Sequence, residues 1–454
     1  GLAVGIDYAL FIVTRHRTSL LHGQDLVESI SRAVGTAGSA VVFAGLTVVI
    51  ALTALVLSGL PILAEMGLVA AFTVAVTVLV AVTVSPALLR LMGTRVISRR
   101  GWRAAGFATS GDPNSRTTPD DGTDEEHGGW FVRLVTLRPW LTVLAVVGVL
   151  GVLAIPVGSI QLGLPDGGRE ATGTTAHTAY TTVGEQFGPG INGPIVAVTT
   201  LPEELRPTDE ASLANVQAMI ATRLKVIEGV RSVVPFGVSP DQATLAFQVV
   251  PTTGPADPAT AETFHRVEFT ASQLERRENI KLGLTGQTVA NIEVSERLAA
   301  ALPAYLAVVV GLSVLILLLV FRSLVVPLIA TGGFLLSIAA AFGATVAVHQ
   351  WGWLGAAFGV HQAGPLLSVM PIIIIGVLFG LAMDYQMFLV SGMHEARSHG
   401  EDSRTAVRTG FVHGAKVVTA AAIIMTSVFL GFAFSHLAMV RPIGFALAVG
   451  VLLD

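Results

Sequence analysis

The sequence contains no cysteine and few charged residues. Without cysteine, the 454 residues can form no disulfide, no thiolate nucleophile and no cysteine-ligated metal site. Charged residues make up 13% of the chain, against about 25% in an average soluble domain, and hydrophobic residues make up 52%. So few charges cannot cover a soluble surface, and a net charge of −4 offers no basic excess for nucleic acid. The composition favours an integral membrane protein.

Long apolar runs recur at the length needed to cross a bilayer. About 20 apolar residues span the hydrocarbon core as an α-helix. Whole runs of this kind are predicted to span the membrane at residues 39–60, 66–89, 140–157, 304–321, 325–349, 366–390 and 417–436. Two partial runs, residues 1–13 and the residues from 443 onward, are interpreted as pieces of two further spans, because both ends of the chain look cut.

Basic residues cluster in three of the polar segments between these runs. The segments are residues 15–32, 90–103 and 397–416. The positive-inside rule places them in the cytoplasm. Residues 93–138 are therefore predicted to be a cytoplasmic linker, partly disordered because its polar stretch has little to bury. Residues 158–302 then fall outside the cell, and their 16 acidic and 10 basic residues suit an exported domain.

The outer segment has the pattern of an α+β domain. Strands are expected at residues 195–200, 232–237, 244–250 and 280–284, and helices at residues 209–227 and 257–277. This β-α-β-β-α-β order is typical of a ferredoxin-like fold. A further helix, residues 288–302, is expected to run straight into the next membrane span.

The chain also contains an internal repeat. A shift of 377 residues places Asp7-Tyr8 on Asp384-Tyr385 without a gap. Other identities under this shift are Phe11 with Phe388, Asp25 with Asp402, Ser58 with Ser435 and Gly67 with Gly444. Each copy has an apolar run carrying Asp-Tyr, a polar loop and two more apolar runs. Two homologous membrane halves are therefore predicted, an arrangement that recurs in transporters.

The repeated Asp-Tyr pairs are the candidate functional residues. Counted from the polar flanks at 1.5 Å per residue, Asp7 and Asp384 lie roughly 12 and 16 Å into the membrane. A carboxylate at that depth costs at least ~2.5–3.5 kcal/mol, so it should face the bundle interior or a water-filled cavity. The adjacent Tyr8 and Tyr385 hydroxyls can donate to a carboxylate or relay a proton through water. One such aspartate is equally well explained by a packed polar contact, but two equivalent pairs favour a proton relay.

Motifs for nucleotide hydrolysis and covalent catalysis are absent from the sequence. Neither G-x-x-x-x-G-K-[ST] nor G-x-S-x-G occurs. His394 and His399 resemble a zinc motif, but they are five residues apart, about 140° around a helix, where metal ligation needs four. We therefore expect no enzyme activity, no cofactor and no metal site.

Three stretches resemble a known family. They are GIDYALFIVTRHR at residues 5–17, GLAMDYQMFLVSGMHEA at residues 380–396 and LGLPDGG at residues 162–168. The first two resemble the Asp-Tyr motifs of the fourth and tenth spans of MmpL proteins, the actinobacterial branch of the resistance-nodulation-division (RND) transporters. The third is similar to the start of that family's second outer domain. One departure is Arg15-His16-Arg17 in the first copy, which lacks the nearby glutamate that tends to follow the family's motif.

The resemblance implies a polytopic α-helical membrane protein of RND type, with two pseudo-symmetric halves, here truncated, and an α+β ferredoxin-like extracytoplasmic porter domain. The implied segments are the end of the first half with the remnant of span 4 and spans 5–6 at residues 1–92, the linker at 93–138, span 7 at 139–157, the porter domain at 158–302, and spans 8–12, the last truncated, at 303–454. Spans 1–3 and the first porter domain are expected to be missing, so the fragment alone should not transport.

The resemblance also implies a function. It implies proton-driven export of a lipid or other hydrophobic or amphipathic small molecule across the cytoplasmic membrane, with Asp7, Tyr8, Asp384 and Tyr385 as the proton relay. The expected partners are the lipid bilayer, protons and the cargo. A homo-oligomer or accessory envelope proteins are further candidates, and no nucleic acid is expected. Two alternatives stay open: a sterol- or lipid-sensing receptor of RND architecture, and a protein-translocation factor similar to SecDF.

Overall fold

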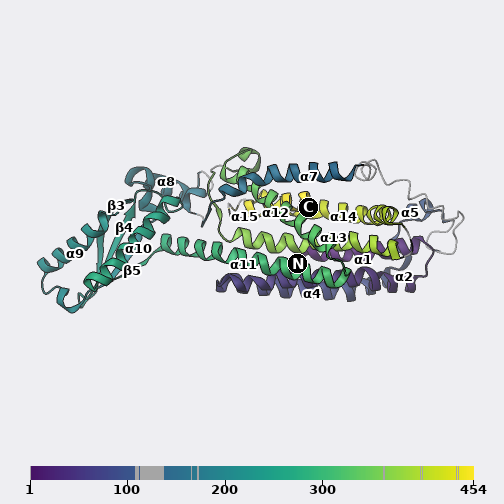
Figure 1. The fold of residues 1–454 in the computed structure, drawn as a ribbon, viewed down its shortest axis with the longest axis horizontal. Coiled ribbons are helices and arrows are strands. Elements are labelled where there is room, and N and C mark those ends of the chain that lie inside the picture. Colours follow the sequence, from purple (N-terminus) through teal and green to yellow (C-terminus); the bar gives the residue numbers. More distant parts are fainter. Residues whose placement is uncertain are drawn as a thin grey trace.

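The computed structural model is elongated, with a long helical bundle and an α/β unit beyond one of its ends (Figure 1). The structure describes residues 2–107, 112, 138–164, 166–170, 173–360, 363–398, 400, 402–435, 437 and 439–454. Most of the linker predicted at residues 93–138 lies outside the described residues. The predicted disorder of that linker therefore stays a prediction.

Helices make up most of the described chain. The α-helices are α1 (Leu2–Leu21), α2 (Leu26–Ala33), α3 (Ser39–Thr53), α4 (Pro61–Met92), α5 (Arg99–Ala104), α7 (Pro139–Ala154), α8 (Thr175–Phe187), α9 (Glu210–Lys225), α10 (Pro258–Glu278), α11 (Gln287–Phe321), α12 (Val325–Thr345), α13 (Met370–Ser398), α14 (Ser403–Ala433) and α15 (Val440–Leu453). The strands are β1 (Leu162–Gly163), β2 (Ile195–Thr200), β3 (Val230–Val238), β4 (Thr244–Pro251), β5 (Lys281–Thr285) and β6 (Leu366–Leu367).

Six helical segments in the described ranges are long and apolar enough to cross a membrane. They are Leu26–Ser58, Pro61–Val96, Pro139–Ser159, Gln287–Leu319, Val325–Gln350 and Met370–Met393. A seventh is counted if the two parts of α14, Thr405–Val412 and Val417–Ala433, form one span bent by 44°. The chain is therefore a multi-pass membrane protein, as its composition predicts.

Local sequence explains where several helices begin. Pro61 and Pro139 lie in the first turns of α4 and α7, where the backbone N–H that proline lacks would have no helical partner. Asp25 caps α2 by accepting a hydrogen bond from the backbone of Val27. Pro303 differs because it lies inside α11, the helix that runs from the α/β unit into the bundle (Figure 1).

The α/β unit follows the chain order β2-α9-β3-β4-α10-β5. Its four strands form an antiparallel sheet in the order β3-β4-β2-β5. Ala197 of β2 and Phe247 of β4 are register partners at its centre. Both are buried in one core with Leu224 of α9 and Val267 of α10. The two helices therefore cover the same face of the sheet, because both pack on the same alternate strand residues.

A second, small sheet lies where the α/β unit meets the bundle. Parallel strands β1 and β6 pair Leu162 with Leu366 and so join the end of α7 to the start of α13. The Gln350 side chain donates to the Ser159 carbonyl and accepts from the Gln161 backbone, at 2.6 and 2.9 Å. These bonds fix the exit of α7 against the end of α12.

The two membrane halves repeat local structures at a spacing of 377 residues. Gly23 and Gly400 both turn the chain with a positive φ, 83° and 93° respectively, a conformation that glycine adopts without steric cost. Matching hydrogen bonds are Ser29 N to Asp25 O with Ala406 N to Asp402 O, and Leu60 N to Ser58 Oγ with Leu437 N to Ser435 Oγ. The sequence repeat is therefore also a structural one.

Helix packing follows the same relation. Within the halves, α1 packs on α4 as α13 packs on α15, and α3 packs on α4 as α14 packs on α15. Across the halves, α1 contacts α14 and α13 contacts α3. The π-helical turn Val34–Gly38 before α3 and the bend of α14 after Val412 fall at equivalent positions. Both halves thus break their second helix at the same place.

Candidate functional site

Asp7 and Tyr8 lie on α1, inside the bundle. Asp7 is 3% exposed and Tyr8 is 1% exposed. Among the described atoms, neither carboxylate oxygen of Asp7 meets the geometry of a hydrogen bond. Burying a carboxylate without strong hydrogen bonds is costly when it is charged. Gain of a proton by the Asp7 carboxyl group would therefore strongly lower the free-energy cost of burying it.

Tyr385 of α13 approaches Asp7 from the other half. Its side chain is buried and interacts with the Asp7 carboxyl group. Its ring centroid lies 6.5 Å from that of Phe11, one helical turn beyond Asp7, at an interplanar angle of 48°. The backbone of Asp384 lies beside Tyr385 in α13, but the side chain of Asp384 lies outside the described residues. The structure thus brings together an aspartate and a tyrosine from different copies of the motif.

This pairing differs from the simplest interpretation of the sequence, in which each aspartate works with the tyrosine that follows it. Consecutive residues of an α-helix point about 100° apart and do not face each other. Asp7 and Tyr8 are both buried, so they are directed at different neighbours. The tyrosine that meets Asp7 is consequently supplied by packing between the halves.

Small residues allow the helices that carry the motif to pack closely. Gly380 lies one turn before Asp384 and faces α3, where a Cβ atom would come within 2.5 Å of Val48 Cγ2. Gly5 of α1 faces Thr77 of α4, where the corresponding distance to Cγ2 would be 3.1 Å. A side chain at residue 380 would push α13 away from α3. The position of Tyr385 therefore depends on a glycine.

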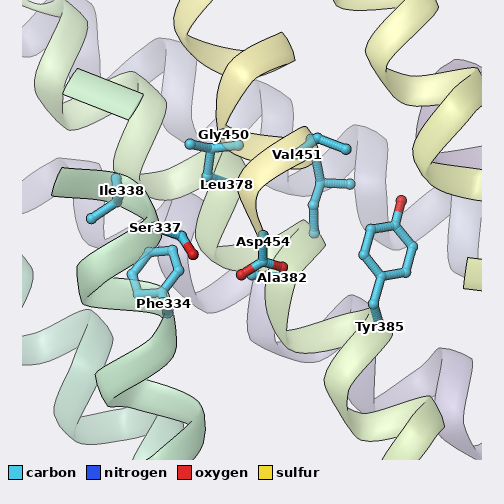
Figure 2. A pocket seen from close by; sticks show the side chains of 10 residues that line it. Phe334, Ser337, Ile338, Leu378, Ala382, Tyr385, Gly450, Val451 and Asp454 are labelled. Carbon is cyan, nitrogen blue, oxygen red and sulfur yellow. The ribbon is translucent and has the colours of Figure 1, made fainter. Parts of the chain in front are cut away.

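A cavity adjoins Tyr385 on α13. Figure 2 shows Tyr385 on one side of this small cavity and Phe334 and Ser337 of α12 on the other, with Asp454 between them. The small cavity measures about 10 Å³, close to the space that one water molecule needs. A larger cavity of about 940 Å³ lies between α7, α12, α13, α14 and α15 and is also lined by Tyr385. Tyr385 therefore contacts both Asp7 and a space that can hold water.

Another cavity lies farther along α1, toward the end of the bundle distant from the α/β unit (Figure 1). It measures about 110 Å³ and lies between α1, α13, α14 and the start of α3. Its polar lining consists of Thr14, Arg15, Thr18, Thr36 and Ser391. Hydroxyl groups both donate and accept hydrogen bonds, so this lining suits water. Thr14 and Ser391 are equivalent in the repeat, which places the cavity where the halves meet.

No group of three histidine, aspartate or glutamate side chains in the described ranges is placed to hold a metal ion. The His394 side chain and the whole of His399 lie outside those ranges. The argument against a zinc site at this pair therefore still rests on their spacing in the sequence.

Sequence reasoning missed Tyr305. This residue of α11 is 1% exposed, and its hydroxyl donates to the backbone carbonyl of Ala51 in α3 at 3.2 Å. A signal was available, because Tyr305 is one of four tyrosines in the chain and begins an apolar run. A phenol hydroxyl in such a place needs a partner from another helix, although the sequence does not show which one.

Comparison with known proteins decides the family. Residues 1–137 and 170–454 match the model of the MMPL family. The chain belongs to the MMPL family. Among its MMPL relatives, the membrane protein YdfJ of Bacillus subtilis is 39% identical over the whole chain and 59% of its own length. The mycolic acid-containing lipids exporter MmpL11 of Mycolicibacterium smegmatis is 32% identical over the whole chain and 46% of its own length.

A third MMPL relative, the trehalose monomycolate exporter MmpL3 of Mycobacterium tuberculosis, is 27% identical over the whole chain and 49% of its own length. The chain thus spans between 46% and 59% of the length of these three relatives. A solved structure, that of the hedgehog release protein Disp from the water bear Hypsibius dujardini, matches 99% of the chain and 60% of its own. The TM-score is 0.59 at 14% identity, which shows a shared fold.

Proposed function

We propose that the protein exports a lipid or another hydrophobic or amphipathic small molecule across the cytoplasmic membrane, driven by the proton-motive force. The observation that carries this proposal is that Asp7 and Tyr385, from the two copies of the motif, are both buried, with the Tyr385 ring 6.5 Å from that of Phe11, one turn beyond Asp7. This arrangement brings together residues from the two copies of a motif whose aspartates are costly to bury when charged. A proton removes that charge and so lowers the cost. Asp7, Tyr8, Asp384 and Tyr385 form the proposed relay.

The relay works by changing which packing of the two halves is preferred. Protonation of Asp7 and Asp384 removes buried charge, so the helices that carry them can approach or separate at lower cost. A proton moving inward releases about 2.3 kcal/mol per 100 mV of membrane potential, and about 1.4 kcal/mol per pH unit. One or two protons therefore provide enough free energy to shift a two-state equilibrium strongly.

Two cavities support a route for these protons. The space beside Tyr385 extends to Thr142 of α7 and Ile329 of α12, each about one turn from the start of its helix. The hydroxyl-lined cavity at Thr14 and Ser391 lies toward the basic loops, and the positive-inside rule assigns those loops to the cytoplasm. We propose that protons leave the relay toward the cytoplasm through the second space.

The α/β unit is the proposed porter domain, outside the cytoplasmic membrane. Its strand order, with the first and third strands at the centre, is that of the ferredoxin-like fold. The proposed cargo class draws on two relatives, one named an exporter of mycolic acid-containing lipids and one an exporter of trehalose monomycolate. Both names describe derivatives of mycolic acid, and we infer a cargo of the same general class, a lipid or another amphipathic molecule.

The test replaces each relay aspartate in the intact protein. A deletion strain of the source organism is complemented with the wild type, with Asp7→Asn, with Asp384→Asn, or with Asp241→Asn as a matched control in the exposed turn of the α/β unit. Surface-extractable and intracellular lipids are then compared by mass spectrometry. The proposal predicts that a lipid lost from the surface of the deletion strain returns with the wild type and the control but not with the relay variants.

A protonophore distinguishes the alternatives. Collapse of the proton gradient should stop export by the wild type within the time that membranes stay intact. If the deletion, the variants and the protonophore all leave the surface lipids unchanged, the exporter proposal is contradicted. That result would favour a sterol- or lipid-sensing receptor instead. Crosslinking of secreted, unfolded polypeptides to the α/β unit would favour a translocation factor instead.

A further inference from the structure

Helix α11 is the direct connection between the α/β unit and the relay. It begins at Gln287, two residues after β5 ends, and continues to Phe321 inside the bundle (Figure 1). Pro303 lies near its middle. Because proline lacks the N–H that would bond to the carbonyl four residues earlier, the helix is weakest and most easily bent at this point.

Tyr305, two residues after Pro303, holds α11 in place on the bundle side of the proline. The side chain is 1% exposed, and its hydroxyl donates to the carbonyl of Ala51. Ala51 lies near the end of α3, just before the chain tightens into a 3-10 turn at Ala54–Ser58. Carbonyl groups at a helix end need partners from outside the helix. The bond therefore joins α11 of the second half to α3 of the first, at a carbonyl group near a helix end.

Gly376 of α13 leaves room for the same hydroxyl. A Cβ atom at residue 376 would lie 2.6 Å from Tyr305 Oη, well inside the contact distance. The tip of the tyrosine ring thus lies between α3 and α13. Gly376 precedes Asp384 by two helical turns, about 12 Å along the same helix. A displacement of α13 toward α11 at Gly376 would therefore strike the Tyr305 hydroxyl and disturb its bond to Ala51.

Two more polar contacts connect α11 with the chain around the relay. Ser313 Oγ donates to Met383 Sδ at 3.3 Å, and Met383 immediately precedes Asp384. On the other side of Pro303, Ser295 Oγ lies 2.6 Å from Ser368 Oγ, just before α13 begins. α11 is consequently held to the relay helix or its entry on both sides of its weakest point.

We propose that Tyr305 is a positioning residue that transmits the state of the relay to the α/β unit, with Pro303 as the hinge. Its hydroxyl bonds to Ala51 of α3 and lies beside Gly376 of α13, two turns before Asp384. It holds α11 against α3 and α13, so that rearrangement of α13 bends α11 and moves the unit attached to it. This inference rests on the proposed function and adds the path by which the relay acts on the outer unit.

The absence of cysteine makes a direct test practicable. Spin labels are placed on introduced cysteines at Ala290, exposed on the outer part of α11, and at Ile62, exposed at the start of α4. Double electron–electron resonance then measures the distance between them in the intact protein. Asp384→Asn imitates a neutral relay. We expect it to shift the distance distribution in the Tyr305 background and to shift it by less than half as much in Tyr305→Phe, which keeps the ring.

A double-mutant cycle identifies the contact. Gly376→Ala should reproduce the effect of Tyr305→Phe and add little to it, because the atom it strikes is then gone. Gly380→Ala is the matched control, since its methyl group would strike Val48 instead, and its effect should add to that of Tyr305→Phe. A change in thermal stability alone does not satisfy the prediction, because the quantity compared is the response to Asp384→Asn.

The outcomes separate the two proposals. An equal shift in wild type and Tyr305→Phe would overturn the role of Tyr305 and leave the relay untouched. No shift at all, in a protein whose export requires Asp384, would overturn transmission through α11. Export that survives both Asp7→Asn and Asp384→Asn would overturn the proposed function itself.

Discussion

The first and second membrane halves place equivalent residues around the cavity that they share. Thr14 and Ser391 contribute a hydroxyl group from each half, whereas Arg15 of the first half is matched by Gly392 of the second. The repeat thus preserves the hydroxyl groups and introduces a positive charge on one side only. The repeat therefore provides two copies of the cavity-lining segment, and the differences between equivalent residues allow the two copies to have different roles.

The attachment of the halves differs as well. α13 of the second half lies among α3, α11, α14 and α15, and the α/β unit joins the bundle through α11. Among the described helices, the contact made by Tyr305 reaches from this second-half element to α3 of the first. The second half therefore connects the relay to the outer unit, and the first half supplies the surface that it moves against.

The largest effects should appear equally in both halves. A Cβ atom at Gly67 would lie 2.4 Å from the Leu52 carbonyl oxygen, and one at the equivalent Gly444 would lie 2.5 Å from the Ala433 nitrogen. Since backbone cannot move aside cheaply, Gly67→Ala and Gly444→Ala should each destabilise by about 3 kcal/mol. Thermal unfolding in detergent measures the loss, and Gly311→Ala is the control because a Cβ there meets nothing within 4 Å. A large effect in one half alone would break the structural equivalence.

The shared cavity gives the next prediction. Thr14→Val and Ser391→Ala each remove a hydroxyl group and should slow proton-driven export about tenfold, equivalent to one lost hydrogen bond of about 1.4 kcal/mol in the proton path. Export is compared with that of Thr53→Val, whose hydroxyl bonds to its own helix on an exposed surface. Unchanged export in both cavity variants would exclude this cavity from the route.

Tyr180 tests the α/β side of the comparison. Its hydroxyl donates to Asp166 Oδ2 at 2.7 Å. Burial, followed by the bond to Asp166 and its charge, raises the pKa of Tyr180, so the hydroxyl keeps the proton that it donates at neutral and moderately alkaline pH. Tyr180→Phe should cost about 1 kcal/mol and speed amide hydrogen exchange in α8, with no effect on proton uptake by the relay. Altered proton uptake would mean that this segment and the membrane halves are not separable.

The smallest effect concerns the tie between α10 and α11. Partial burial lowers the pKa of His265, but hydrogen bonds to Glu296 and Glu268 and their charges outweigh it, so the pKa is raised overall. A raised pKa gives stability that is complete below the unfolded value and is lost as the pH rises through the folded value. The pair is half exposed, so His265→Gln should lower stability by about 1 kcal/mol or less at about pH 5.5 and by nothing measurable at about pH 8.5. Thermal unfolding at the two pH values checks this, and an equal loss at both would contradict it.

Much of this architecture could be predicted because its signals are local. Apolar run length predicts the spans, and alternation and turn residues predict the strands of the α/β unit within a few residues. The bond from Tyr305 to Ala51 could not be predicted, since it joins residues 254 positions apart. The meeting of Asp7 with Tyr385 was equally hidden. The repeat identifies both residues, but only the packing of α1 against the other half shows which tyrosine faces which aspartate.

Proton entry measured in liposomes tests the central claim most directly. The intact protein is reconstituted with trapped pyranine, and an inward proton gradient is imposed with valinomycin and potassium to set the potential. The relay predicts that the wild type and Asp241→Asn acidify the interior, and that Asp7→Asn and Asp384→Asn each reduce the rate about 100-fold or more, as expected when a proton-transfer group is removed. Acidification at the wild-type rate by either relay variant would contradict the account.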